Sequence, residues 1–148
     1  MENRASTFEK HGDSQVFGNR ETGTMLAAYV WKQNGRLRMD VSWRPKKALA
    51  VTFSDDGVHC DEPVITLECD PSSGWENNIN RHCVMPDPNG SGYLMWYTGL
   101  WWEQDKGRSW SGVARSEDGI HFERIQKDPI LSPEADFEGE SVMNPFVM

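Results

Sequence analysis

The apolar residues of this chain occur in short runs separated by turn-forming residues. The first run is MLAAYVW at 25–31, and further runs follow at 35–43 and 48–54. Aromatic and branched side chains in short runs bounded by Gly, Pro, Asn and Asp are typical of β-strands. With 7 Trp among 13 Gly and 8 Pro, the composition favours the same structure, and we expect an all-β protein of short strands and hairpins.

The pattern of runs occurs a second time further along the chain. Runs at 81–85, 91–99 and 111–116 correspond to the first three. The third run of each set ends in the phrase Ser-x-Asp-Gly, at Ser54 and again 62 residues later at Ser116. A segment that leads to a Pro-Val or Pro-Ile stretch follows each phrase and gives a fourth, outer strand. The chain therefore contains two copies of a four-strand unit.

The Ser-x-Asp-Gly phrase predicts a type I′ turn before each outer strand, because Gly accepts positive φ and Asp tolerates it. Both copies continue to a histidine, His59 in the first and His121 in the second. Recurrence in each unit is typical of a structural turn, since Ser and Asp cap turns by bonding nearby amides, whereas an active site occurs once. We expect both histidines on outer strands, without a role in metal binding.

Four antiparallel strands per repeat indicate the blades of a β-propeller. We expect a lead-in segment at 1–21, a first blade at 22–75, a second blade at 76–140 and the first strand of a third blade at 141–148. Propellers close with about 4 to 8 blades, so two blades cannot form a ring. We therefore expect 1–148 to be the N-terminal portion of a single propeller domain, completed by further blades of a longer polypeptide or by another chain.

Charge and cysteine content exclude several kinds of partner. Lys and Arg number 15 against 23 Asp and Glu, giving a net charge of −8 at pH 7. Such a surface repels a phosphate backbone and an anionic membrane, so we expect neither nucleic acid nor membrane as a partner. The three cysteines lack metal-site spacing and indicate free thiols in a reducing compartment. The N-terminus has no apolar signal-peptide run, and we expect a cytoplasmic protein without metal or cofactor.

The segments SDDGVH, GWENNINRHCVM, YLMWYTG, GVARSEDGIHF and FEGESVMNPFVM follow one another in register across both units. This succession resembles the five-bladed β-propeller glycosidases, which include the arabinanases, β-xylosidases, invertases and levansucrases of glycoside hydrolase families 43 and 32, with mannoside phosphorylases as relatives. The resemblance covers the chain from about Glu21 to its end. It implies five blades in the complete protein, with an active site at one mouth of the central channel, at the starts of the innermost strands.

Glycosidases of this kind use two carboxyl groups, one to protonate the leaving oxygen and one to activate water or attack the sugar. The positions before the expected inner strands supply Glu76, Glu138 and Glu140 as catalytic candidates. Apolar rings at Trp75 and Phe137 are expected to raise the pKa of the neighbouring glutamates toward that of a general acid. Because Glu76 and Glu138 recur at one position of the repeat, a structural role at the edge of each blade is an equal alternative.

Polar and aromatic residues near these positions are candidates for binding an oligosaccharide substrate. They are Asn80, Arg81, His82 and Asn144 around the inner strands, the pair Trp43 and Arg44, and the pair Trp101 and Trp102 in the expected loop GLWWEQDKGRSW. Flat rings stack against sugar faces, although tryptophans in such places also simply cover a blade. Several of these residues differ between the repeats, which favours a site over scaffold.

One departure from the family concerns the first blade. The family has an aspartate on the innermost strand there, whereas TMLAAYVW has no acidic residue, and Asp40 on the next strand is not at the matching position. Three functions therefore stay open. The first is a glycoside hydrolase, inactive in this portion alone, and the second is a non-catalytic sugar-binding propeller, which the missing aspartate favours. The third is a sialidase-like propeller, whose Asp-box turn has one residue more between Asp and Gly.

Overall fold

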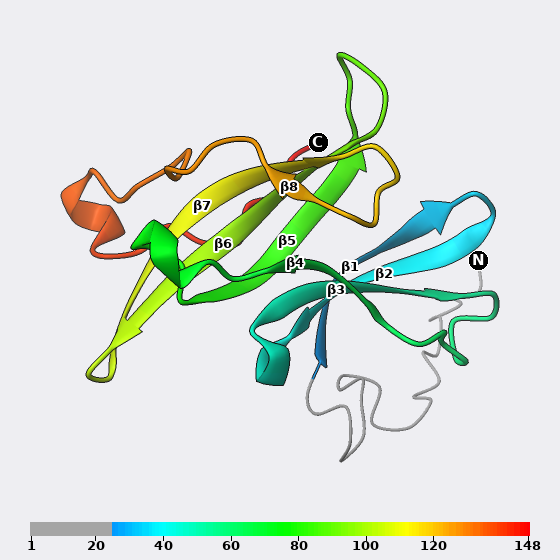
Figure 1. The fold of residues 1–148 in the computed structure, drawn as a ribbon, viewed down its shortest axis with the longest axis horizontal. Coiled ribbons are helices and arrows are strands. Elements are labelled where there is room, and N and C mark those ends of the chain that lie inside the picture. The colour runs from blue at the N-terminus through cyan, green and yellow to red at the C-terminus, as the bar shows by residue number, and fades with distance from the viewer. Residues whose placement is uncertain (1–24) are drawn as a thin grey trace, which may run out of the picture.

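The computed structural model describes residues 25–148, so the expected lead-in at 1–21 and the first residues of the first expected blade lie outside it. The described chain folds into two four-stranded antiparallel sheets joined by loops and three short 3-10 helices (Figure 1). This confirms the all-β class and the prediction of four strands in each unit. Strand order in each sheet follows chain order, as expected when each strand pairs with its successor through a short connection.

The first sheet consists of β1 (Met25–Gln33), β2 (Arg36–Trp43), β3 (Ala48–Ser54) and β4 (Val64–Glu68). The second sheet consists of β5 (Asn78–Pro86), β6 (Tyr93–Glu103), β7 (Lys106–Ser116) and β8 (Glu123–Arg124). The 3-10 helices are η1 (Arg44–Lys46), η2 (Pro71–Ser73) and η3 (Asp136–Glu138). β5 contacts β1, β2 and β3, so the second sheet meets the first through its own first strand.

The hairpin between β6 and β7 differs from the prediction. Its strands continue to a turn at Gln104 and Asp105, where φ is 47° and 64°, instead of ending before a loop GLWWEQDKGRSW. Positive φ at both central residues matches the type I′ turn, whose twist suits the flanking strands. Trp101 and Trp102 therefore belong to β6, and the expectation of a loop there is wrong.

The Ser-x-Asp-Gly phrases form loops capped by their own side chains. Ser54 Oγ accepts the Gly57 N–H at 2.8 Å, and Asp56 Oδ1 accepts the N–H groups of Val58 and His59, each at 2.8 Å. The second copy repeats these contacts 62 residues later. The structural interpretation holds, but the type I′ turn does not, because only the glycine has positive φ. The histidines lie in these loops, not on the outer strands.

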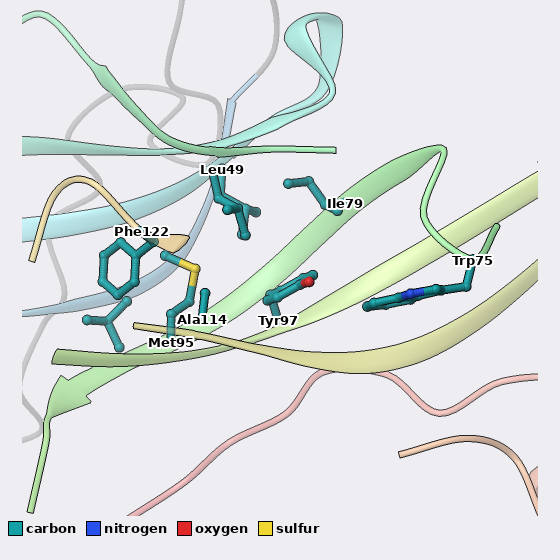
Figure 2. Packing of buried hydrophobic residues seen from close by; sticks show 9 residues of the cluster. Leu49, Trp75, Ile79, Met95, Tyr97, Ala114 and Phe122 are labelled. Carbon is teal, nitrogen blue, oxygen red and sulfur yellow. The ribbon is translucent and has the colours of Figure 1, made fainter. Parts of the chain in front are cut away.

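The main hydrophobic core lies between the two sheets. Leu49 of the first sheet packs with residues of the second, as Figure 2 shows for Ile79, Met95, Tyr97, Ala114 and Phe122. Trp75, which precedes β5, stacks on Tyr97 with ring centroids 6.0 Å apart and planes at 22°. A smaller cluster of Met39, Val41 and Ala50 lies within the first sheet.

The segment 141–148, expected to be the first strand of a third blade, forms no strand. Ser141 makes a single bridge to Ser109, and the rest of the segment has no ladder partner among the described residues. A strand requires a neighbour that accepts and donates hydrogen bonds along its length. The segment nevertheless lies beside the first strands of both sheets, since Phe146 contacts Tyr29 edge-on at 6.2 Å and the Val147 carbonyl lies 3.7 Å from the Cys83 sulfur.

Candidate functional site

The starts of β5 and of the segment 141–148 border a hollow of ≈ 580 Å³, which we call the inner-strand groove. Residues from β6 and from the turn after β2 complete its walls. Its polar and aromatic lining includes Arg44, Asn80, Arg81, Thr98, Trp102 and Asn144. The volume lies within the roughly 300–1,000 Å³ of pockets that hold small molecules. The groove therefore brings together five of the residues predicted to bind sugar, and their role in binding stays a prediction.

A bulge at the start of β5 places two neighbouring side chains in this groove. Asn80 pairs with Thr98 and His82 with Tyr97, so Arg81 is left over between them. Arg81 has a φ of 39°, in the left-handed region that non-glycine residues rarely adopt. Bulges re-aim side chains and are frequent next to functional sites. The interrupted alternation is what allows Asn80 and Arg81, adjacent in sequence, to line the same groove.

The same arrangement of backbone and hydroxyl group occurs on both sides of the groove. The Arg81 N–H donates to Ser42 Oγ at 2.9 Å, and the Asn144 N–H donates to Thr98 Oγ1 at 2.9 Å. Ser42 on β2 and Thr98 on β6 occupy equivalent positions, each three residues after the repeated methionine. Asn144 also has a left-handed φ, 61°. The preceding sheet therefore holds the backbone at each of these two positions.

Trp102 supplies an aromatic surface that is partly open to solvent. The residue is 54% exposed, and its ring packs over Gly107, where an added Cβ would come within 2.9 Å of the ring. Its backbone is fixed by the Asn77 side chain, which accepts the Trp102 N–H at 3.0 Å and donates to the Trp102 carbonyl at 2.9 Å. A fixed, half-open indole of this kind is suited to stacking.

The three candidate catalytic glutamates do not line the groove. Glu76 is buried, with its Oε1 2.5 Å from the Nε of Arg124, and its other oxygen has no hydrogen-bond partner among the described residues. Burial raises the pKa of the Glu76 carboxyl, and the Arg124 guanidinium opposes that rise. A raised pKa is the direction expected for Glu76 beside Trp75. Its ion pair with Arg124 of β8, however, is typical of a structural carboxylate inside the protein.

The two other glutamates lie at the surface, in different surroundings. Glu138 Oε2 accepts the N–H groups of Ala135 and Glu134 at 2.8 Å each, and these bonds lower the pKa of its carboxyl. The expected rise of that pKa beside Phe137 is therefore wrong, because the Phe137 ring is 90% exposed and does not cover the carboxyl. Glu140 forms an exposed ion pair with Arg108 at 3.1 Å. The catalytic role of the three glutamates stays a prediction.

The remaining predicted binding residues lie outside the groove lining. The side chain of His82 is fully buried, with its Nε2 3.5 Å from Asp40 Oδ1. Trp43 packs against the small core cluster, with the Lys46 ammonium 5.8 Å from its ring centroid. Trp101 neighbours Trp102 on β6, and successive side chains of a strand point to opposite faces. The structure thus separates these three from the other candidates.

A buried polar cluster beside His82 was not anticipated from the sequence. Arg38 and Asp40 are fully buried on β2, with Arg38 Nη2 2.7 Å from Asp40 Oδ1. Trp31 Nε1 donates to Asp40 Oδ2 at 3.2 Å, and Arg38 Nη1 donates to the Gly119 carbonyl of the second unit at 2.5 Å. The available signal was an Arg and an Asp two residues apart in an apolar strand, which places both on one face.

The contacts of the Asp40 carboxyl in this cluster favour its ionised form. Burial works to raise its pKa, but His82 and Arg38 lower it by more, so the pKa lies below the ordinary value. The His82 contact, at 3.5 Å, is longer than a good hydrogen bond, whereas Arg38 makes three contacts of 2.7–3.1 Å. We therefore regard the guanidinium as the main partner of Asp40. The cluster links the first sheet to the turn before β8.

Several other features bear on the class of site. Cys60, Cys69 and Cys83 are free thiols, as predicted. Within residues 25–148, no three His, Cys, Asp or Glu side chains come together in a way that would hold a metal ion. No helix in that range has the length and apolar character needed to cross a membrane.

Comparison with protein-family models and with curated proteins found no match to this chain. The resemblance to propeller glycosidases therefore depends on the sequence segments quoted above.

Proposed function

We propose that this chain is part of a β-propeller that binds carbohydrate in the inner-strand groove. The observation that carries the proposal is the convergence of Arg44, Asn80, Arg81, Trp102 and Asn144 on one hollow, although they come from four separate stretches of the sequence. Amide and guanidinium groups beside an exposed indole offer donors and acceptors for hydroxyl groups and a flat face for a sugar ring.

The propeller arrangement is supported by contacts that repeat from unit to unit. β5 docks on β2 through the Arg81 N–H and the Ser42 hydroxyl, and the segment 141–148 docks on β6 through the equivalent bond from Asn144 to Thr98. When the same contact recurs between each unit and the next, the sheets form a radial array. The contact between Tyr29 and Phe146 further supports first strands that converge on a common axis.

A further sheet is part of the proposal. Trp75 and Glu76 precede β5 and are buried against β6 and β8, through Tyr97 and Arg124. Phe137 and Glu138 stand at the equivalent positions before 141–148, yet the Phe137 ring is 90% exposed. The equivalent Trp75 is only 6% exposed, so the repeat implies that Phe137 is covered in the same way. We propose that a third sheet, from a longer polypeptide or from another chain, covers Phe137.

Sugar binding without hydrolysis is the activity that the described groove supports best. Glycosidases of the usual kind place two carboxyl groups about 5–9.5 Å apart across the scissile bond, and among residues 25–148 no Asp or Glu lines the groove. A glycoside hydrolase is the second candidate, favoured by the sequence resemblance, and it would need carboxylates in the groove from outside the described residues. The two candidates share the same binding residues.

Isothermal titration of the chain with neutral arabino-, xylo-, fructo- and manno-oligosaccharides tests the proposal. We expect at least one to bind, and we expect Asn80→Ala with Asn144→Ala to weaken that binding about tenfold or more, since each side chain loses hydrogen bonds. Asn89→Ala is the matched control, because Asn89 is an exposed asparagine outside the groove lining. Absence of binding, or equal binding by the double variant, would refute the proposal.

Aryl glycosides separate the two candidates. We expect no nitrophenol release by this chain. Release that is lost in Glu140→Gln would instead establish the hydrolase and place Glu140 in its chemistry.

A further inference from the structure

The arginines of the chain divide into two groups. Among the described residues, five form ion pairs with carboxylates, at Arg36, Arg38, Arg108, Arg115 and Arg124. Within the same range, Arg44 and Arg81 have no such ion pair, and both line the inner-strand groove. In a chain with a net charge of −8, carboxylates are abundant. The two unneutralised guanidinium groups of the described region therefore gather at one place.

The surroundings of the groove keep its positive charge uncompensated. Its remaining lining among residues 25–148 consists of Asn, Thr, Ile, Leu, Met and Trp side chains, and no Asp or Glu of that range lines it. The Arg81 backbone is held at a φ of 39° by bonds of 2.9 Å to Ser42 Oγ and Asn80 Oδ1, so the strand presents this side chain at a fixed bulge. Neutral sugars need hydroxyl partners, which asparagines supply, but they do not need two cations.

We infer that the sugar bound in the groove is acidic, a uronic acid unit whose carboxylate is bound by the Arg81 guanidinium. Arg44 adds to the positive potential of the groove, Asn80 and Asn144 bind hydroxyl groups, and Trp102 lies beside the ring. The inference rests on the proposed function, since it names the class of sugar that the same groove takes. Its physical basis is the planar guanidinium fork, which matches the two oxygens of a carboxylate.

The test compares each acidic oligosaccharide with its own carboxyl-reduced form, which keeps the linkages and removes the charge. Calorimetric titrations of the chain use uronic acid trimers from pectin, alginate and glucuronan and the three reduced counterparts. We expect one acidic trimer to bind about tenfold more tightly than its reduced form, as charge-assisted bonds require. Raising sodium chloride from about 50 to about 500 mM should weaken the acidic trimer only, because salt screens exposed charges.

Variants assign the effect to particular residues. Arg81→Gln should lower the affinity for the acidic trimer about tenfold and leave that for the reduced trimer within about twofold. Arg44→Gln should produce a smaller loss in the same direction, and it keeps the test valid if the bulge does not tolerate a change at Arg81. Arg108→Gln is the matched control, because it removes an exposed arginine that is paired with Glu140, and it should change neither affinity.

The outcomes distinguish this inference from the proposed function. If the reduced trimers bind as tightly as the acidic ones, the inference is wrong and the proposal of a sugar-binding groove stands. If no acidic or neutral oligosaccharide binds, both fail. If inorganic phosphate or sulfate binds as tightly as the trimers and depends on the same arginines, the groove is a site for a free oxyanion, and the inference is again overturned.

Discussion

Replacing Gly99 with alanine should break the packing at the base of the second sheet. Gly99 lies on β6 directly beneath Trp75, and its φ is not in the left-handed region, so the requirement for glycine is one of space. An added Cβ would overlap Cζ3 and Cε3 of the indole, well inside the 3.0 Å that real Cβ contacts respect. The ring itself is confined by its stack on Tyr97 and by a 2.9 Å bond from its Nε1 to the Lys127 carbonyl.

The size of the effect follows from these constraints. Overpacking a core by one methyl group costs about 1–3 kcal/mol, and full loss of a buried tryptophan costs about 3–5 kcal/mol. Because the indole cannot move without losing its stack and its hydrogen bond, we expect Gly99→Ala to lose about 3 kcal/mol in the free energy of unfolding. In a domain of this length that loss corresponds to a fall of about 6–12 °C in the melting temperature.

Urea and thermal unfolding followed by near-ultraviolet circular dichroism measure this change. Gly90→Ala is the control, because Gly90 also lacks a left-handed φ and the nearest atom to an added Cβ is 3.6 Å away; we expect a change within about 0.5 kcal/mol. Combining Gly99→Ala with Trp75→Leu should cost less than the sum of the single changes, since the two residues share one contact. Equal stability of Gly99→Ala and Gly90→Ala would refute the docking of Trp75.

Two further predictions concern charged groups. Asp40→Asn leaves Arg38 buried without its anion and should lower the free energy of unfolding in urea by about 3–5 kcal/mol. The control Asp61→Asn removes an exposed partner of an arginine and should lower it by at most about 1 kcal/mol. Equal losses would contradict the buried pair. The pKa values of Asp56 and Asp118 lie below the ordinary value, because each carboxylate bonds the ring of the histidine three residues later and accepts backbone N–H bonds from its own loop. The stability that these carboxylates contribute is present above about pH 4 and is lost as the pH falls below it. Replacing both with Asn should therefore reduce the fall in unfolding free energy at acid pH. An unchanged fall would contradict those bonds.

The fold could be predicted further than the site, for a physical reason. Strand runs, turns and the repeat are local patterns, and they gave two four-stranded units correctly. The partner of Glu76 is Arg124, 48 residues away, and no local pattern identifies it as the residue that neutralises that carboxyl. The bulge at Arg81 likewise has no marker in the sequence, yet it decides that Asn80 and Arg81 share the groove while His82 points into the core.

The groove is composite: Arg44 comes from the turn between β2 and β3 of the first sheet and Asn80 from β5 of the second, and Ser42 on β2 accepts a hydrogen bond from the Arg81 backbone. A ligand bound there contacts both sheets at once. If the two sheets separate, the binding site is lost. A ligand that binds only the folded state raises the free energy of unfolding by about 2.7 kcal/mol when its concentration is a hundred times the dissociation constant. A melting-temperature screen of a glycan library therefore reports ligands whatever their chemical class, and loss of the rise in Asn80→Ala with Asn144→Ala assigns a ligand to this groove.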